Sequence, residues 1–225
     1  MSTVAITNDR FEIVAPVYLE TGLEPVPIQC VQVEAADEDA LGHARLAAAE
    51  AELILISSAR TVGLLWPEGQ MPEVEVAAVG QSSADATGRA GGHVVTTGRS
   101  GLLDLIEAIA GRIRTARVVF PHAGGTDPSV ITRLREIAGS VEEHVVYRTA
   151  PVPALPTEVD AVAFSSPSAV QGWLLARGLD DVVVGVIGKT TAAAVARVRQ
   201  PDVVSPRPAH GSLAVAMNQH MEANR

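Results

Sequence analysis

Short apolar runs alternate along this chain with longer segments of helical periodicity. The runs Leu53–Ile56 and Val182–Ile187 are rich in Leu, Ile and Val, and each leads directly into Gly, Ser or Thr residues and then into a helical pattern. Continuous apolar runs of this length are typical of strands that are buried on both faces of a parallel sheet. Because strands alternate with helices, the pattern predicts an α/β fold with right-handed crossovers.

The same alternation predicts the individual elements. In the middle of the chain, strands are expected at residues 53–57, 74–79, 93–96, 117–121 and 142–147, and helices at residues 40–50, 59–65, 82–90, 100–114 and 129–138. Towards the C-terminus, strands are expected at residues 159–165, 182–187 and 202–204, and helices at residues 167–177, 190–198 and 211–222. The chain begins with a strand at 3–7, a helix at 10–21 that Pro16 interrupts, and an extended segment at 23–33. Prolines in that segment favour the edge of a sheet, and Asn8 and Ser100 are placed to cap helices.

Four short motifs form two matching pairs. The stretch Ser57–Val62 matches Ser165–Val170, and Ala78–Ala84 matches Val186–Ala192. The offset is the same for both pairs, because 166 − 58 and 188 − 80 are both 108. A single offset indicates two copies of one architecture. In each motif, glycine lets the chain turn or a hydroxyl can cap the following helix, so the motifs belong at helix starts.

The second copy lacks the strand–helix–strand segment that residues 117–147 supply to the first. Residues 3–33 have that pattern, so we expect a discontinuous domain, residues 1–33 with 154–225, and a continuous domain, residues 37–148. The expected linkers are residues 34–36 and the proline-containing residues 149–153. The predicted fold is therefore two similar flavodoxin-like or Rossmann-like domains with parallel sheets, joined by a two-stranded hinge that permits closure around a cleft.

Composition narrows the classes of protein that this chain can belong to. With 47% hydrophobic and only 3% aromatic residues, the cores are expected to consist of Val, Ala, Leu and Ile. A net charge of −9 argues against a nucleic-acid partner. The sequence has no secretion signal and no apolar run of membrane-spanning length, so we expect a cytoplasmic protein without a membrane partner. We also expect a monomer. Cys30 is the one cysteine, which excludes an internal disulfide, and it is most simply a buried strand thiol.

The helix starts are candidate anion-binding sites, because their hydroxyls and unpaired N–H groups favour a carboxylate or a phosphate. The candidate residues are Ser58, Gly80, Ser82, Ser83, Ser166, Ser168, Gly188, Lys189, Thr190 and Thr191. Any one of them alone is more simply part of an ordinary strand-to-helix turn, and Lys189, the only lysine, is equally explained as a solvated residue. Four turns in one register favour a binding site.

Other sites with a recognisable pattern are missing. The chain has no G-x-G-x-x-G, P-loop or G-x-S-x-G motif, and its six histidines have no metal-ligand spacing, so no metal is predicted. His122 is the one histidine at a strand end that is expected to face the cleft. Gly124, with Gly125, permits close backbone approach to a ligand or simply forms a turn. Tyr147 ends a strand just before a linker, where an interface-packing role is as good an explanation as a functional one.

The order of these motifs resembles the uroporphyrinogen-III synthase family. The motifs are Ser57-Ser58-x-x-x-Val62, Val79-Gly80-x-Ser82-Ser83-Ala84, Phe120-Pro121-x-x-Gly124, Val146-Tyr147-Arg148-Thr149, Phe164-x-Ser166-x-Ser168-x-Val170 and Ile187-Gly188-x-Thr190-Thr191-Ala192. Each motif is short, so the specificity lies in their order and spacing. The resemblance extends over essentially the whole chain and includes the split-domain topology.

The resemblance implies an enzyme of tetrapyrrole biosynthesis, the route to haem, sirohaem and cobalamin. Such an enzyme closes the linear tetrapyrrole hydroxymethylbilane to uroporphyrinogen III with loss of water, inverts the last ring through a spirocyclic intermediate, and uses no cofactor. By the same resemblance, Tyr147 is the proton donor to the departing hydroxyl. Ser58, Ser83, Ser166 and Thr191, with neighbouring N–H groups, hold the carboxylates of the substrate.

Two departures from the family pattern keep an alternative open. The first strand ends in Thr7-Asn8-Asp9 where the family often has Thr-Arg-Pro, and Thr126–Ser129 lacks an arginine that is common there. The alternative is a non-catalytic module of the same fold that senses a tetrapyrrole or another polyacid in a regulatory system. A two-domain solute-binding protein is disfavoured because the sequence has no export signal.

Overall fold

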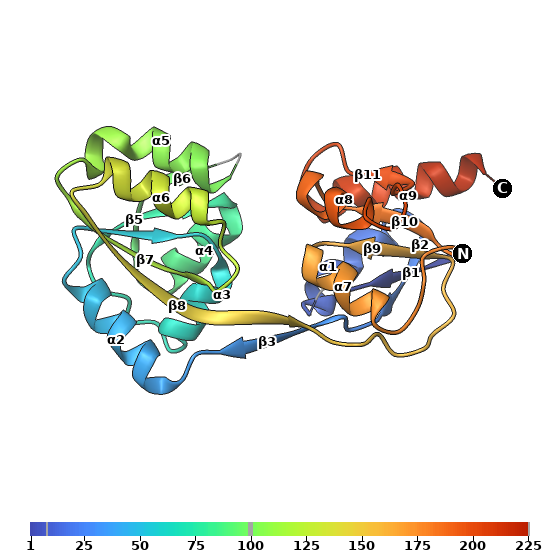
Figure 1. Cartoon of the computed structure of the whole chain (residues 1–225), viewed down its shortest axis with the longest axis horizontal. Coiled ribbons are helices and arrows are strands. Elements are labelled where there is room, and N and C mark those ends of the chain that lie inside the picture. The colour runs from blue at the N-terminus through green and yellow to red at the C-terminus, as the bar shows by residue number, and fades with distance from the viewer. Residues whose placement is uncertain (8, 99–100, 225) are drawn as a thin grey trace. The chain divides into compact units, whose positions relative to one another are not determined.

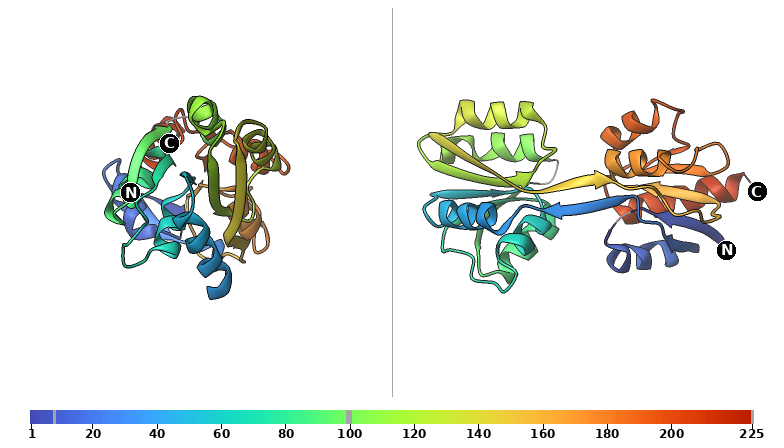
Figure 2. Two further views of the ribbon diagram at one scale, coloured as in Figure 1. Left: turned by 90° about the vertical axis from the view of Figure 1, so that its left-hand side faces the viewer. Right: turned by 60° about the horizontal axis from the view of Figure 1, so that its bottom comes forward.

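The computed structural model describes residues 1–7, 9–98 and 101–224 of the chain (Figure 1). The predicted caps Asn8 and Ser100 therefore lie outside the described residues. The chain divides into two compact units, a discontinuous one, Met1–Gln32 with Ala150–Arg225, and a continuous one, Val33–Thr149. Each unit contains one sheet with helices on both faces, so the predicted α/β fold class with two parallel sheets is confirmed (Figures 1 and 2).

The sheet of the continuous unit has the strand order β3-β8-β7-β4-β5-β6. Its strands are β3 (Val31–Ala35), β4 (Leu53–Ile56), β5 (Glu75–Val79), β6 (His93–Gly98), β7 (Arg117–Ala123) and β8 (Ser140–Pro151). Neighbouring strands from β8 to β6 are parallel. Their carboxyl ends consequently meet at one edge of the sheet, where ligands of open α/β sheets bind.

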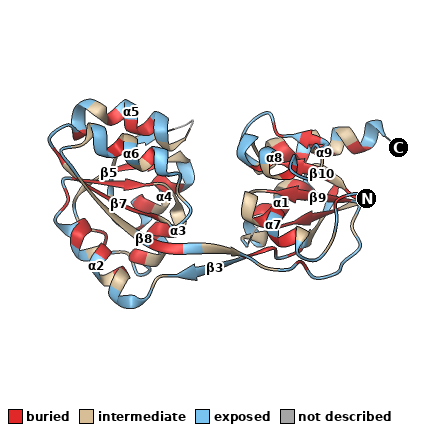
Figure 3. Ribbon diagram, in the orientation of Figure 1, coloured by how far each residue is buried: buried red, intermediate tan, exposed pale blue. Residues whose placement is uncertain are grey.

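In the described part of the continuous unit, five helices cover this sheet. On one face lie α2 (Glu38–Ala49), α3 (Ala59–Leu65) and α4 (Gly80–Arg89), and on the other lie α5 (Leu102–Ile113) and α6 (Pro128–Ile137). The run Leu53–Ile56 shows why the strand is apolar throughout. Ile54 and Ile56 pack against α2 and α3, whereas Leu53 and Leu55 pack against α5 and α6. The neighbouring strands β5 and β7 are likewise buried over most of their length (Figure 3). Alternate side chains of a strand point to opposite faces, so both sets must be apolar.

The sheet of the discontinuous unit has the order β11-β10-β9-β1-β2. Its strands are β1 (Ser2–Ile6), β2 (Leu23–Pro27), β9 (Ala161–Phe164), β10 (Val183–Val186) and β11 (Val203–Val204). Helices α7 (Pro167–Leu174) and α8 (Lys189–Val195) pack on one face, and α1 (Phe11–Leu19) and α9 (His210–Ala223) on the other. The proline-containing β2 is at the edge, where a strand tolerates residues that lack an N–H group.

The two sheets repeat one arrangement. β9, β10 and β11 are ordered as β4, β5 and β6 are, and β1 lies beside β9 as β7 lies beside β4. An acidic residue precedes the central strand in both sheets. Glu52 Oε2 accepts from the backbone N–H of Arg117 at 2.7 Å, and Asp160 Oδ2 accepts from that of Thr3 at 2.7 Å. Each carboxylate thereby fixes the start of the neighbouring strand in register.

Several elements differ from the predicted ones. α1 runs through Pro16 to Leu19 instead of breaking there. α4 begins at Gly80, two residues before the start expected near residue 82, and Gly80 itself has a φ of +74°, which glycine tolerates. β8 is longer than predicted and continues through residues 149–151, and β3 includes residues 34 and 35. The two segments expected to be linkers are therefore largely strand.

Candidate active site

Three turns at the carboxyl edge of the continuous sheet bring the predicted residues of that unit together. Ser58 is the N-cap of α3, and its hydroxyl accepts from the backbone N–H of Arg60 at 3.2 Å. Gly80 begins α4 after the adjacent strand β5. Gly124 follows β7, and Tyr147 lies on β8 opposite Ala123. The strand order places these groups along one edge, as the parallel topology predicts.

Tyr147 is held on the face of the sheet that α2 and α3 cover. It belongs to the same apolar cluster as Val62 and Leu65, and its side chain is largely buried. The guanidinium carbon of Arg60 lies 5.4 Å from the centre of the Tyr147 ring, within the range of a cation–π contact. A tyrosine confined by packing on one side and by a cation over its ring has few rotamers left, which is what a proton donor in fixed position requires.

The loop after β7 is bonded directly to the strand that carries Tyr147. The N–H of Gly124 donates to the carbonyl oxygen of Tyr147 at 2.8 Å. Gly124 also has no room for a side chain, because a Cβ there would lie 2.9 Å from Cγ of Arg148. The glycine therefore permits a close approach between this loop and β8 and is more than a turn residue.

His122 does not lie exposed at this edge. Only 4% of it is exposed, and its ring stacks on Phe120 with the ring centres 4.6 Å apart. Its Nδ1 lies 2.8 Å from the carbonyl oxygen of Ala123 and 3.0 Å from the Thr126 hydroxyl, and its Nε2 lies 3.7 Å from Oε2 of Glu143. The histidine thus supports the loop from beneath.

The predicted residues of the discontinuous unit lie at the carboxyl ends of β9 and β10. Ser166 is the N-cap of α7, and its hydroxyl accepts from the N–H of Ala169 at 3.2 Å, with Ser168 in the first turn of the same helix. Gly188 is the N-cap of α8. Lys189 and Thr190, the first residues of α8, are exposed.

Ser83 and Thr191 occupy equivalent places in the two units and are both buried, with exposed fractions of 2% and 3%. They lie inside the first turns of α4 and α8, one residue beyond Ser82 and Thr190, which are exposed. A ligand at either helix start would thus meet the exposed hydroxyl of Ser82 or Thr190 and the backbone first. It would reach the buried hydroxyl of Ser83 or Thr191 only after that.

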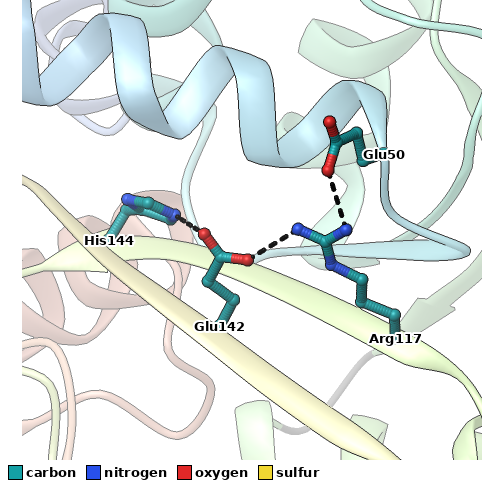
Figure 4. A network of polar contacts seen from close by, with 4 residues as sticks. All are labelled: Glu50, Arg117, Glu142 and His144. Atoms are coloured by element: carbon teal, nitrogen blue, oxygen red, sulfur yellow. Dashed lines mark hydrogen bonds and ion pairs between the residues drawn. The ribbon is translucent and has the colours of Figure 1, made fainter.

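A polar network lies at the opposite end of the continuous sheet, where β7 and β8 begin (Figure 4). Arg117 donates to Glu50 and to Glu142 at 2.9 Å each, and Glu142 lies 3.1 Å from Nε2 of His144. The hydrogen bond from Arg117 and, to a lesser extent, that from His144 lower the pKa of the Glu142 carboxyl. This network joins α2 to two strands and contains none of the predicted site residues.

The described residues provide neither a metal site nor a membrane span. No group of three or more His, Cys, Asp or Glu side chains in this part of the chain is arranged to hold a metal ion. None of the described helices is long and apolar enough to cross a membrane.

Comparison with known proteins decides the family. The family model of uroporphyrinogen-III synthase HemD matches residues 14–214, which is most of the chain. The chain belongs to the uroporphyrinogen-III synthase family. No curated protein matches it.

Solved structures of this family share the fold. The uroporphyrinogen-III synthetase of Helicobacter pylori 26695 is 15% identical, with a TM-score of 0.68 over 97% of this chain and 100% of that one. A mutant uroporphyrinogen III synthase of the extremely thermophilic bacterium Thermus thermophilus is 18% identical, with a TM-score of 0.66 over 99% of this chain and 100% of that one. At such low identities the likeness shows the fold, and it confirms the two-unit α/β architecture.

Two arginines near Tyr147 were not among the candidates from the sequence. Arg60 lies in the Ser57–Val62 motif, two residues after the cap, and Arg148 directly follows the tyrosine. Both stand within motifs, but nothing in a linear pattern indicates that a side chain after β4 reaches the ring of a residue on β8. A β-bulge between His122 and Ala123, which shifts the register of β7 against β8, contributes to that placement.

Proposed function

We propose that this member of the uroporphyrinogen-III synthase family catalyses the cyclisation of hydroxymethylbilane to uroporphyrinogen III and water, with inversion of the last pyrrole ring. The observation that carries the proposal is the placement of Tyr147. Its ring is packed among residues of α3, covered by Arg60, and lies at the sheet edge where Ser58, Gly80 and Gly124 also lie.

Tyr147 is the proton donor in the proposed reaction. The bond between the terminal carbon of the substrate and its hydroxyl breaks, the phenol supplies a proton to that oxygen, and the oxygen leaves as water. The carbon, now electron-poor, is attacked by the last pyrrole ring at its substituted position, which gives the spirocyclic intermediate. The bond from that position to the original methylene carbon then breaks, and the methylene rejoins the inverted ring at its unsubstituted carbon. That carbon loses one proton, which balances the proton that Tyr147 supplied, so the net products are uroporphyrinogen III and water. A positioned acid of this kind contributes about 10²- to 10⁴-fold in rate.

The remaining residues are proposed to bind carboxylates. In the continuous unit these are Ser58, Gly80 and Ser82, and Ser83 behind them. In the discontinuous unit they are Ser166, Ser168, Gly188, Lys189, Thr190 and Thr191. The substrate carries eight carboxylates, and helix starts with free N–H groups favour anions. Gly124 lets the backbone approach the ligand, and His122 acts through its support of the Gly124 loop.

Positioning is the main contribution in this proposal. The linear substrate also closes unaided to the isomer without ring inversion, so the enzyme must hold the chain in the one geometry that leads to inversion. No step requires a cofactor.

The test is to supply the purified protein with hydroxymethylbilane and to resolve the isomers of the cyclised product. Isomer III above the background of the protein-free reaction supports catalysis. Binding of the substrate with formation of isomer I alone contradicts it and favours the sensing module.

A further inference from the structure

The side chain of Arg148 lies against the loop that follows β7. A Cβ at Gly124 would be 2.9 Å from Cγ of Arg148 and 3.1 Å from its Nη1, so the arginine occupies the space that the glycine leaves open. The N–H of Gly124 donates to the carbonyl oxygen of Tyr147 at 2.8 Å. The position of Arg148 is thus tied to that of Tyr147 through the chain and through the loop.

The side chain of Arg148 is exposed and has no ion pair or hydrogen bond with any of residues 1–7, 9–98 and 101–224. Five other arginines of the continuous unit are paired with a glutamate: Arg45, Arg112, Arg117, Arg133 and Arg135. The backbone N–H of Gly125, next to Gly124, also lacks an acceptor within the described ranges. A guanidinium and an amide that are both unpaired and lie at one loop form a set of donors for an external anion.

Acidic residues nearby limit where that anion binds. Tyr147 and Arg148 line a hollow of about 220 Å³ together with Glu34 and Asp37. Asp37 is the N-cap of α2 and accepts from the N–H of Ala40 at 2.8 Å. Neither acid pairs with Arg148, whose Nη1 lies at Gly124. An anion is therefore expected over the Gly124–Gly125 loop, away from the two carboxylates.

We propose that Arg148, with the N–H of Gly125 as a second donor, binds one carboxylate of the tetrapyrrole substrate and thereby positions the pyrrole ring on which Tyr147 acts. This inference rests on the proposed function. It gives the continuous unit a cationic anchor for the substrate, although the family-typical arginine is absent from residues 126–129.

The test compares Arg148→Gln with Arg114→Gln. Arg114 is an exposed arginine of the same unit, without a pairing partner among the described residues, and it lies three residues before β7 at the other end of the strand. We expect Arg148→Gln to raise KM for hydroxymethylbilane about tenfold, the value for one lost charge-assisted contact, and to change kcat less than about threefold. Arg114→Gln should change neither.

Salt dependence separates an electrostatic contact from a structural one. The wild-type KM should rise between about 0.02 M and 0.3 M NaCl as screening increases, and Arg148→Gln should respond less steeply. Gly124→Ala is a second variant that keeps the charge but displaces the Arg148 side chain, and it should raise KM in the same direction. If Arg148→Gln lowers the melting temperature, the KM of Gly124→Ala decides the test instead, and a wild-type KM for that variant would contradict the inference.

Three results overturn the inference. These are an Arg148→Gln variant that matches Arg114→Gln, a raised KM with unchanged salt dependence, and a Gly124→Ala variant with wild-type KM. If the wild-type protein makes no isomer III, the proposed function fails separately. Equilibrium binding of the octacarboxylate uroporphyrin III to the wild type and to Arg148→Gln then tests the arginine, and equal affinities would contradict the inference.

Discussion

At the scale of single residues, Tyr147 is the group whose chemistry matters most. Its ring lies between the apolar cluster of α3 and the guanidinium of Arg60, 5.4 Å from the ring centre. We expect Tyr147→Phe to lower kcat by roughly 10²-fold because the proposed proton donor is lost. We expect it to change the affinity for hydroxymethylbilane less than about threefold because the packing of the ring is kept. Steady-state and single-turnover kinetics measure the two effects separately.

Tyr18 provides a matched control, since it is the only other tyrosine and lies in the discontinuous unit. It is fully buried, its hydroxyl lies 3.2 Å from Nδ1 of His210, and burial raises its pKa. Tyr18→Phe should cost about 1 kcal/mol of stability and leave turnover unchanged. Equal rates for Tyr147→Phe and the wild type would remove Tyr147 from the mechanism.

His210 links stability to pH. Burial lowers its pKa in the folded state. The unfolded state therefore binds a proton at a higher pH than the folded state does, so stability is present above the unfolded pKa near 6.5 and is lost as the pH falls below it. His210→Asn should flatten this dependence of the melting temperature between about pH 7.5 and pH 5. His220→Asn, in the last turn of the same helix, is the control, and an equal flattening there would contradict the assignment.

At the scale of elements, α7 is the helix on which the chain's two crossing segments rest. A Cβ at Gly172 would lie 1.9 Å from the carbonyl oxygen of Cys30 and 2.6 Å from that of Val152, which are both backbone atoms and cannot move aside easily. The N–H of Val152 donates to the carbonyl oxygen of Cys30, and the N–H of Ala154 donates to that of Gly172, near the points where the chain leaves and re-enters the discontinuous unit.

Alanine substitutions in α7 and α3 should consequently have opposite effects. Gly172→Ala should destabilise the discontinuous unit by at least about 3 kcal/mol, because the added methyl overlaps backbone. Gly63→Ala, in the equivalent helix α3, meets nothing within 4 Å and should stabilise by about 0.5–1 kcal/mol.

Fluorescence measures each unit separately, since Trp173 is buried in one unit and Trp66 in the other. In variants that keep only one tryptophan, Gly172→Ala should shift the unfolding transition reported by Trp173 much more than the transition reported by Trp66. An unchanged Trp173 transition would show that the contact at Gly172 is not as tight as described.

The elements themselves were largely predictable, for physical reasons that are visible in particular residues. Leu53–Ile56 is apolar at every position because both faces of β4 are buried, and the repeat offset of 108 recurs in the strands, with 161 − 53 and 183 − 75 both equal to it. The structure starts α4 two residues before the position expected near residue 82, at Gly80, whose positive φ a hydroxyl-cap pattern does not indicate. The burial of His122 was likewise not visible in the sequence, because it depends on the loop folding back to place Ala123 and Thr126 at its Nδ1.

At the scale of the whole molecule, the chain repeats one sheet arrangement twice and assembles the second copy from both ends. The duplication explains why helix starts occur in equivalent pairs, with Ser58 and Ser166 as caps and Gly80 and Gly188 at the next turn. Tyr147 has no such counterpart, because the only other tyrosine, Tyr18, lies on helix α1 and not at the end of a strand. The proposed binding groups therefore occur in both units, whereas the proposed proton donor belongs to one.

The most direct measurement of the central claim is the isomer composition formed from hydroxymethylbilane at substoichiometric protein. An enzyme turns over many times, so the fraction of isomer III should exceed the molar ratio of protein to substrate, and Tyr147→Phe should abolish most of that excess. Formation of isomer III limited to one equivalent per protein, or isomer I alone, would contradict the proposal that this chain is a catalyst.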